Sequence, residues 1–163
     1  MKLTFATAVL TAALALSCKK PEPPKVTPKA ATVTKLDPLG VDMVVTLTAE
    51  NPNGVPLSVR SVSGHVVLDG RLDLGTFDVP SGVSLPAHAS TTLEVPVRAK
   101  WAGVGALASL AATRRAVPYV VEGKANVGGE RLNVDVPFRV QGVITDELVA
   151  QAAMRSLPGL LPK

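Results

Sequence analysis

Residues 41–53, with the sequence VDMVVTLTAENPN, constrain the fold more than any other part of the chain. Apolar residues recur at every second position from Val41 to Ala49, with threonine and acidic residues between them, which indicates a strand with one buried face. The pattern stops at Asn51, Pro52 and Asn53. Because proline cannot donate a backbone hydrogen bond and pushes the preceding residue towards extended geometry, sheet pairing is expected to end at Pro52.

The residues that follow predict further strands joined by tight turns. The Asn53-Gly54 pair can supply the positive φ angles that a reversal needs, and Asp69-Gly70 predicts a hairpin. Pro96 marks one stretch as an edge or bulged strand, since proline cannot donate to a ladder. The alternating stretches are residues 58–69, 71–79, 91–100, 119–127 and 131–140, with a loop over residues 80–89 that contains a short edge strand at 83–85.

Two segments break the alternation. Apolar residues recur at helical spacing over residues 101–115, which predicts a helix inserted between strands. Residues 145–157 predict a terminal helix, opened by Thr145 or Asp146 and stopped by Pro158. About seven strands with hairpin connections, one inserted helix and a C-terminal helix favour a mainly β fold, an antiparallel β-sandwich.

The first 18 residues are typical of an export signal, with Lys2 followed by an apolar run over residues 3–16. The run is shorter than the ~20 residues that cross a bilayer. Residues 15–18, ALSC, resemble a bacterial lipobox, although Leu14 lies one position before the usual place of the leucine. In that case diacylglycerol and acyl chains such as palmitate anchor the chain through Cys18. The alternative is ordinary cleavage after residue 15, which leaves this only cysteine as an unpaired thiol.

Residues 19–35 are rich in proline and lysine and predict a disordered tether, which could span about 50 Å in polyproline II geometry. It is either a plain spacer or a segment whose lysines attract anionic lipid headgroups. The residue directly after the cysteine is Lys19 and not aspartate, which resembles the pattern that directs lipoproteins to the outer membrane. We therefore expect an exported, membrane-anchored lipoprotein, on the periplasmic face of the outer membrane if the host is Gram-negative.

The chain of 163 residues is expected to hold one folded domain. The expected divisions are a signal peptide (1–18), the tether (19–35), the sandwich (36–142) and a helical extension (143–163). Six lysines before residue 36 outnumber Glu22 by more than the whole net charge of +4, so the folded part is nearly neutral. It has no basic stripe interleaved with aromatic residues, and we expect no nucleic-acid partner.

No catalytic, metal or cofactor site is expected. Residues 103–108, GVGALA, match the dinucleotide pattern GxGxxA, but the strand before them alternates instead of being continuously apolar, which favours a simple helix entry. His65 and His88 have no second histidine or cysteine at ligand spacing, and both are expected to be exposed. The aspartates at 69, 73 and 78 lack the spacing of a calcium loop.

The sequence resembles the LEA type 2 family, the WHy (water stress and hypersensitive response) domain. The resemblance rests on Asn51, Pro52 and Asn53 at the end of an alternating strand, and on the order of later segments over about residues 35–142. The later segments are Pro56-Leu57, residues 90–97 (STTLEVPV), the inserted helix and residues 118–123 (PYVVEG). The resemblance implies an immunoglobulin-like or fibronectin-III-like sandwich, a role in tolerance of desiccation or other stress, and no catalytic residues.

These sequence features are compatible with two functions. The first is a non-enzymatic, lipid-anchored module that protects or contacts stress-destabilised proteins or lipid surfaces. The second is an envelope lipoprotein that binds or carries an apolar ligand or assists envelope assembly. A large continuous apolar cavity would favour the second function, and a filled core with a polar exterior would favour the first.

Overall fold

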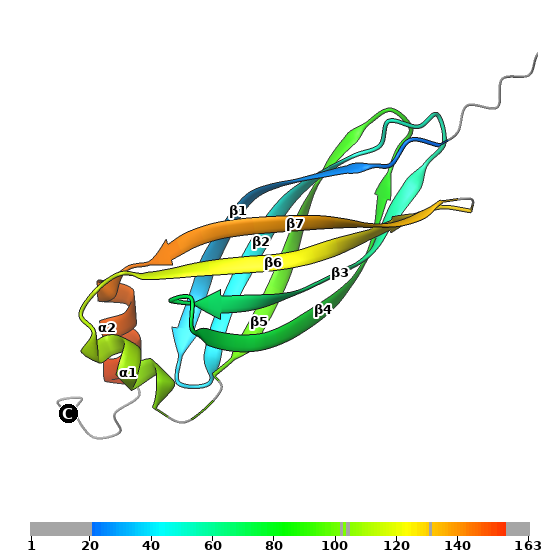
Figure 1. The fold of residues 1–163 in the computed structure, drawn as a ribbon. Coiled ribbons are helices and arrows are strands. Elements are labelled where there is room, and N and C mark those ends of the chain that lie inside the picture. The colour runs from blue at the N-terminus through cyan, green and yellow to red at the C-terminus, as the bar shows by residue number, and fades with distance from the viewer. Residues whose placement is uncertain (1–20, 102, 104, 131, 156–163) are drawn as a thin grey trace, which may run out of the picture.

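The computed structural model describes residues 21–101, 103, 105–130 and 132–155, which form seven strands and two helices (Figure 1). The export signal and Cys18 lie outside the described residues. No helix in the described part of the chain is long and apolar enough to cross a membrane. The elements are β1 (Lys25–Asp37), β2 (Gly40–Glu50), β3 (Leu57–Leu68), β4 (Leu72–Leu85), β5 (Ser90–Lys100), α1 (Ala106–Ala112), β6 (Val117–Gly128), β7 (Asn133–Ile144) and α2 (Asp146–Arg155).

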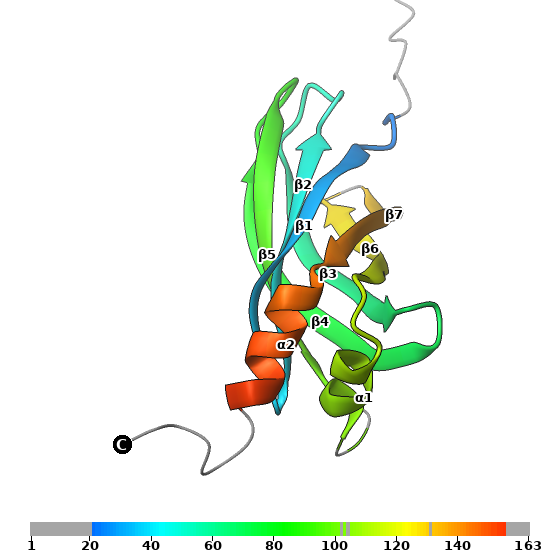
Figure 2. The same ribbon diagram turned by 90° about the vertical axis from the view of Figure 1, so that its left-hand side faces the viewer.

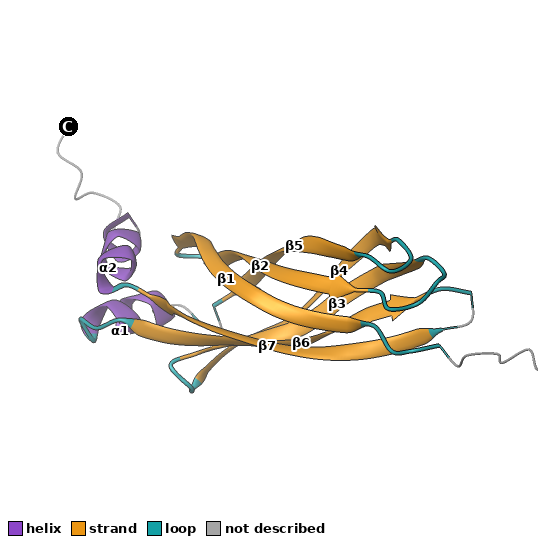
Figure 3. Cartoon of the chain, turned by 90° about the horizontal axis from the view of Figure 1, so that it is seen from above, coloured by secondary structure: helices purple, strands orange, loops and turns teal. Residues whose placement is uncertain are grey.

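The strands form two antiparallel sheets that pack face to face (Figure 3). One sheet has the order β1-β2-β5 and the other has the order β4-β3-β6-β7. The two sheets also meet along their edges, where β1 contacts β7 and β4 contacts β5. The expected mainly β, antiparallel sandwich of about seven strands is confirmed.

The central strand β2 explains why the layers hold together. Its alternate residues Val41, Met43 and Val45 are fully or almost fully buried, and they continue to Leu47 and Ala49 as the middle of the core. Strand β5 pairs with β2 in one unbroken register. Pro96 is tolerated because β5 is an edge strand of its sheet. Of the two predictions for this strand, the edge strand is therefore correct, and its pairing with β2 contains no bulge.

The tether prediction is wrong for residues 25–35, which belong to strand β1. This strand pairs with β2 from Lys25 opposite Glu50 to Asp37 opposite Gly40. Its apolar residues Val26, Ala31 and Val33 pack partly buried against the core. Two register shifts, after Pro28 and after Val33, adapt the lysine- and proline-rich sequence to the ladder, and an edge strand tolerates such irregularity.

The loop predicted over residues 80–89 is shorter than expected, since β4 continues to Leu85. Pro80 lies within this strand, and two features let the strand run through it. Strand β4 is an edge strand, and the register with β3 shifts between Val59 and Ser61, the residue that pairs with Pro80. The strand number therefore agrees with the sequence, but β1 takes the place of the separate short strand at 83–85.

Both helices lie at the end of the sandwich where β1 turns into β2, and they contact each other (Figure 2). Helix α1 is shorter than the predicted 101–115, because the chain leaves helical geometry at Arg114, with a φ of 46°. Helix α2 begins after Thr145, whose hydroxyl accepts a bond from the Leu148 N–H at 3.4 Å. The predicted helix end at 157 and its stop at Pro158 lie outside the described residues.

Candidate functional site

Asn51 ends β2 with a side chain that is 0% exposed, and among the described residues it is the only buried polar or charged one. Its Nδ2 donates to the carbonyl oxygens of Val55 at 2.8 Å, Leu85 at 3.2 Å and Pro86 at 3.1 Å. Its Oδ1 accepts from the Asn53 N–H at 3.0 Å. One amide therefore joins the end of β2, the following turn and the β4–β5 loop.

Asn53 holds the chain where it enters the sandwich. Its Oδ1 accepts from the Glu22 N–H at 2.8 Å, and its Nδ2 donates to the Glu22 carbonyl oxygen at 2.8 Å. The side-chain amide thus bonds both backbone groups of one residue, as a neighbouring strand would. The Asn53 carbonyl also accepts from the His88 N–H at 3.1 Å.

The reversal after β2 does not use positive φ angles at Asn53 or Gly54, contrary to the expectation from the Asn-Gly pair. In this part of the molecule the positive φ belongs to His88, at 54°. A Cβ atom at Gly54 would lie 3.3 Å from His88 Nε2, a tight contact that a small shift of the exposed imidazole would relieve. The side-chain bonds of Asn51 set the turn instead, since they satisfy three carbonyl groups at once.

An open pocket of about 920 Å³ lies at this end of the sandwich. It is lined by the entering chain at Glu22, by the turn over residues 52–57, by His88 and by the β6–β7 connection at Glu130 and Leu132. Val55 stands on its rim with 58% of its surface exposed. The lining combines proline and aliphatic side chains with two carboxylates and one imidazole.

The structure does not bring the other residues considered from the sequence into this pocket. His65 lies on β3, where its Nε2 is 3.8 Å from Glu122 Oε2, and Glu122 also pairs with Arg139 of β7. His65 is half-buried, and His88 is exposed as expected. No group of three His, Cys, Asp or Glu residues within the described ranges could hold a metal ion.

The three aspartates serve turns and solvent-facing positions. Asp69, with a φ of 53°, accepts two 2.7 Å bonds from Arg115 Nη2 and a further bond from Arg71. Arg115 and then Arg71 hold the pKa of this carboxyl below its usual value. Asp73 accepts from the Gly75 N–H at 2.8 Å, and Asp78 is exposed.

The glycine-rich segment before α1 is a helix entry. Gly105 caps the helix with a φ of 92°, a value that favours glycine. Helix α1 has seven residues and follows the edge strand of an antiparallel sheet. An acidic residue about 20 positions after such a glycine-rich segment can bind a ribose, but Glu122 lies in β6 and pairs with Arg139.

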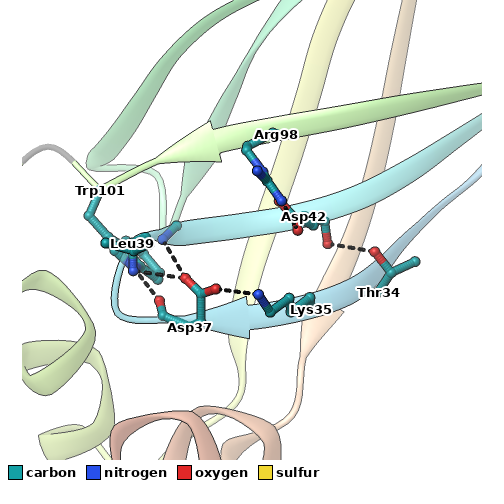
Figure 4. A network of polar contacts seen from close by, with 8 residues as sticks. Thr34, Lys35, Asp37, Leu39, Asp42, Arg98 and Trp101 are labelled. Carbon is teal, nitrogen blue, oxygen red and sulfur yellow. Dashed lines mark hydrogen bonds and ion pairs between the residues drawn. The ribbon is translucent and has the colours of Figure 1, made fainter. Parts of the chain in front are cut away.

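A polar network at the helical end was missed by the sequence interpretation, which placed Lys35 in a tether (Figure 4). The Asp37 carboxylate accepts from the Leu39 N–H at 2.8 Å and lies 2.7 Å from Lys35 Nζ. The Asp37 carbonyl accepts from Trp101 Nε1 at 2.7 Å, which joins the β1–β2 turn to the end of β5. The Lys35 hydrogen bond and then the Leu39 N–H lower the pKa of Asp37.

A hydrogen bond between the two sheets was also not predicted from the sequence. Tyr119 of β6 is buried, and its hydroxyl donates to the Ala31 carbonyl of β1. Burial raises the pKa of this phenol. Gly142 lies opposite Tyr119 in the β6–β7 register and leaves room for the ring. The sequence signal was a single tyrosine paired with a glycine on the next strand.

The described residues therefore define a class of protein: an antiparallel two-sheet sandwich with an asparagine-pinned turn at one end and two short helices at the other. The sequence pattern of the family described as late embryogenesis abundant protein matches residues 46–142, more than half of the chain. The chain belongs to this family, LEA type 2, and the resemblance seen in the sequence is confirmed.

Solved structures show the same fold at low sequence identity. A solution structure of a protein from Arabidopsis thaliana gives a TM-score of 0.62 at 18% identity, covering 86% of this chain and 91% of that chain. A candidate late embryogenesis abundant protein gives 0.58 at 20% identity, covering 76% and 71%. A crystal structure of a protein from Archaeoglobus fulgidus gives 0.52 at 15% identity, covering 77% and 97%. No curated protein matches the chain.

Proposed function

We propose that this chain is a non-enzymatic protective module, held on a membrane by acyl chains on Cys18, that acts during desiccation or other water stress. Membership of the LEA type 2 family supports the stress role. The observation that carries the non-enzymatic part is the state of Asn51. Its side chain is fully buried, and among the described residues its side-chain amide bonds only to backbone carbonyls and to Asn53. The amide at the family's motif is thus committed to holding a turn.

The outer face of the four-stranded sheet suits a module that contacts other proteins without aggregating. Lys124 Nζ lies 2.6 Å from Asp135 Oδ2, and Asn126 donates to the other oxygen of Asp135 at 2.8 Å. Lys124 and then Asn126 lower the pKa of Asp135. A paired, solvated face of this kind favours transient contact, and protection without turnover is stoichiometric.

The location is proposed from the sequence. The lipobox-like residues 15–18 support acylation at Cys18 and export, with the periplasmic face of the outer membrane as the site in a Gram-negative host. The partners are then the membrane itself and stress-destabilised proteins or lipid surfaces close to it. The chain enters the sandwich at Glu22, only four positions after Cys18.

The test is survival of a deletion strain through drying and osmotic shock, with plasmid copies of the parent gene and of Cys18→Ser. The parent copy should restore survival and be recovered with membranes. The Cys18→Ser protein should move to the soluble envelope fraction, because acylation requires the thiol. Unchanged survival of the deletion strain contradicts the stress role, and equal membrane recovery of parent and variant contradicts the anchor.

The pocket supports a second candidate, binding of an apolar ligand. Its volume of about 920 Å³ lies within the usual range of small-molecule sites, ~300–1,000 Å³. Titration of the Cys18→Ser protein with a fluorescent fatty acid tests this function. Saturable binding that weakens in Val55→Asp would favour it, because Val55 stands exposed on the pocket rim. No saturable binding would exclude a fatty-acid carrier.

A further inference from the structure

The entering chain is fixed at the pocket end of the sandwich. Glu22 is held by two hydrogen bonds of 2.8 Å to Asn53, and β1 begins three residues later at Lys25. Both bonds use the backbone of Glu22, so its side chain plays no part in them. The position at which the folded unit is attached to anything upstream is therefore the Asn53 turn.

The chain between Cys18 and this attachment is short. Four residue steps separate Cys18 from Glu22, and a chain extends at most ~3.3–3.6 Å per residue, or about 14 Å in all. The strands run along the length of the sandwich, and the longest has 14 residues, which corresponds to roughly 45 Å. An anchor on Cys18 thus keeps the Asn53 end close to the bilayer, and the helices lie at the opposite end of the sandwich (Figures 1 and 2).

The pocket end also exposes apolar side chains that can face lipid. Val55 is a large hydrophobic residue with 58% of its surface exposed, and the half-buried Pro52 and the exposed Pro56 lie near it in the pocket lining. In contrast, the outward positions of β5, on the long side of the sandwich, include Glu94, Arg98 and Lys100 and are exposed. The anchored end therefore meets a bilayer more favourably than the charged face of β5 does.

We propose that the pocket end, defined by residues 52–57 with Glu22 and His88, is a lipid-facing surface that rests against the bilayer holding the anchor. The proposal rests on the proposed acylation of Cys18. The occupant is the lipid surface, and the two hydrogen bonds between Asn53 and Glu22, together with the pairing of Lys25 opposite Glu50, hold the anchored chain at this end. The helical end, with Met154 64% exposed on α2, points away from the membrane.

The experiment compares two fluorescent labels on the acylated full-length chain in vesicles of phosphatidylethanolamine and phosphatidylglycerol that carry a nitroxide on the lipid headgroup. Val55→Cys and Met154→Cys form a matched pair, because both side chains are exposed and they lie at opposite ends. Cys18 does not react with the label when its thiol carries diacylglycerol. We expect several-fold stronger quenching at position 55. Equal quenching, or stronger quenching at position 154, overturns the proposal.

Two variants test whether the hydrogen bonds between Asn53 and Glu22 contribute to the orientation. Asn53→Ala removes both bonds to Glu22 and should reduce the difference between the two labels, whereas Glu22→Ala keeps both backbone bonds and should preserve it. If Asn53→Ala unfolds by circular dichroism, insertion of ten Gly and Ser residues before Pro21 replaces it. The insertion leaves the bonds between Asn53 and Glu22 intact but lengthens the chain after Cys18, so it should lower quenching at position 55. Unchanged quenching would contradict the claim that the short chain between Cys18 and Glu22 holds this end at the bilayer.

Failure of the orientation and failure of the anchor give different results. Vesicle flotation of the labelled chain is measured first, beside Cys18→Ser. If the parent floats and the variant does not, the anchor stands, and the quenching pattern then decides the orientation alone. If the acylated parent does not float, both the anchor and the lipid-facing surface are wrong.

Discussion

Tyr119 and Gly142 lie opposite each other on β6 and β7, and a Cβ atom on Gly142 would lie 2.2 Å from Tyr119 Oη. The missing side chain lets the tyrosine ring cross towards the other sheet, where its hydroxyl bonds the Ala31 carbonyl of β1. The glycine on one strand thus permits the bond that ties the two sheets together.

Gly142→Ala should displace the ring and destabilise the domain by about 1 to 3 kcal/mol, the usual cost of overpacking. Tyr119→Phe keeps the ring and removes the hydroxyl, with an expected loss of about 0.5 to 1.5 kcal/mol. Urea unfolding of both variants and of the parent measures these losses. A Gly142→Ala protein as stable as the parent would contradict the steric argument.

Asn51→Ala should destabilise the domain by about 1 to 3 kcal/mol, because the buried carbonyl of Leu85 and the part-buried carbonyl of Val55 lose their donor. Asn53→Ala is the matched control, and it should cost less, since its bonds to Glu22 are exposed. Thermal unfolding of the two variants gives the comparison. Loss of protection in Asn51→Ala with an unchanged melting temperature would instead indicate a binding site.

Local patterns predicted the strands whose buried faces alternate cleanly. Leu93, Val95 and Val97 of β5 are buried at every second position, and their periodicity was visible in the sequence. Strand β1 was missed because three lysines and Pro28 interrupt its apolar residues, and its pairing with β2 is a tertiary interaction. The bond between Asn53 and Glu22 links positions 31 residues apart, and no local pattern indicates it.

Strand β1 gives a sharp prediction about truncation. A chain that begins at residue 36 lacks nearly all of β1, so β2 becomes an unpaired edge with its backbone donors and acceptors exposed. We expect this chain to aggregate or to lose cooperative unfolding. A chain that begins at residue 21 should stay monomeric and unfold cooperatively. Size-exclusion chromatography and circular dichroism compare the two. A monomeric, cooperatively folded 36–163 chain would show that β1 is dispensable.

Acid should weaken the β1–β2–β5 sheet through its paired aspartates. Arg98 bonds both carboxylate oxygens of Asp42, at 2.6 and 2.8 Å, and lowers the pKa of that carboxyl. Because the folded pKa is below the unfolded value of about 3.9, the stabilisation is complete above that pH and is lost as pH falls through the folded value.

Melting temperatures measured from about pH 5 down to pH 2 should therefore fall less steeply for Asp42→Asn than for the parent. Asp78→Asn is the control, because Asp78 is exposed and accepts no side-chain bond from a cation in the described part of the chain. Parallel curves for the parent and Asp42→Asn would contradict the linkage.

The most direct test of protection by a folded, stoichiometric module is a dry-down series with a test enzyme and the Cys18→Ser protein. We expect recovered enzyme activity to rise in proportion to the molar ratio of the protein, without nucleotide or metal. We also expect the circular dichroism spectrum to be the same before drying and after rehydration, because a sandwich with this buried core stays folded. Protection no better than that of an inert protein of equal mass would contradict the account.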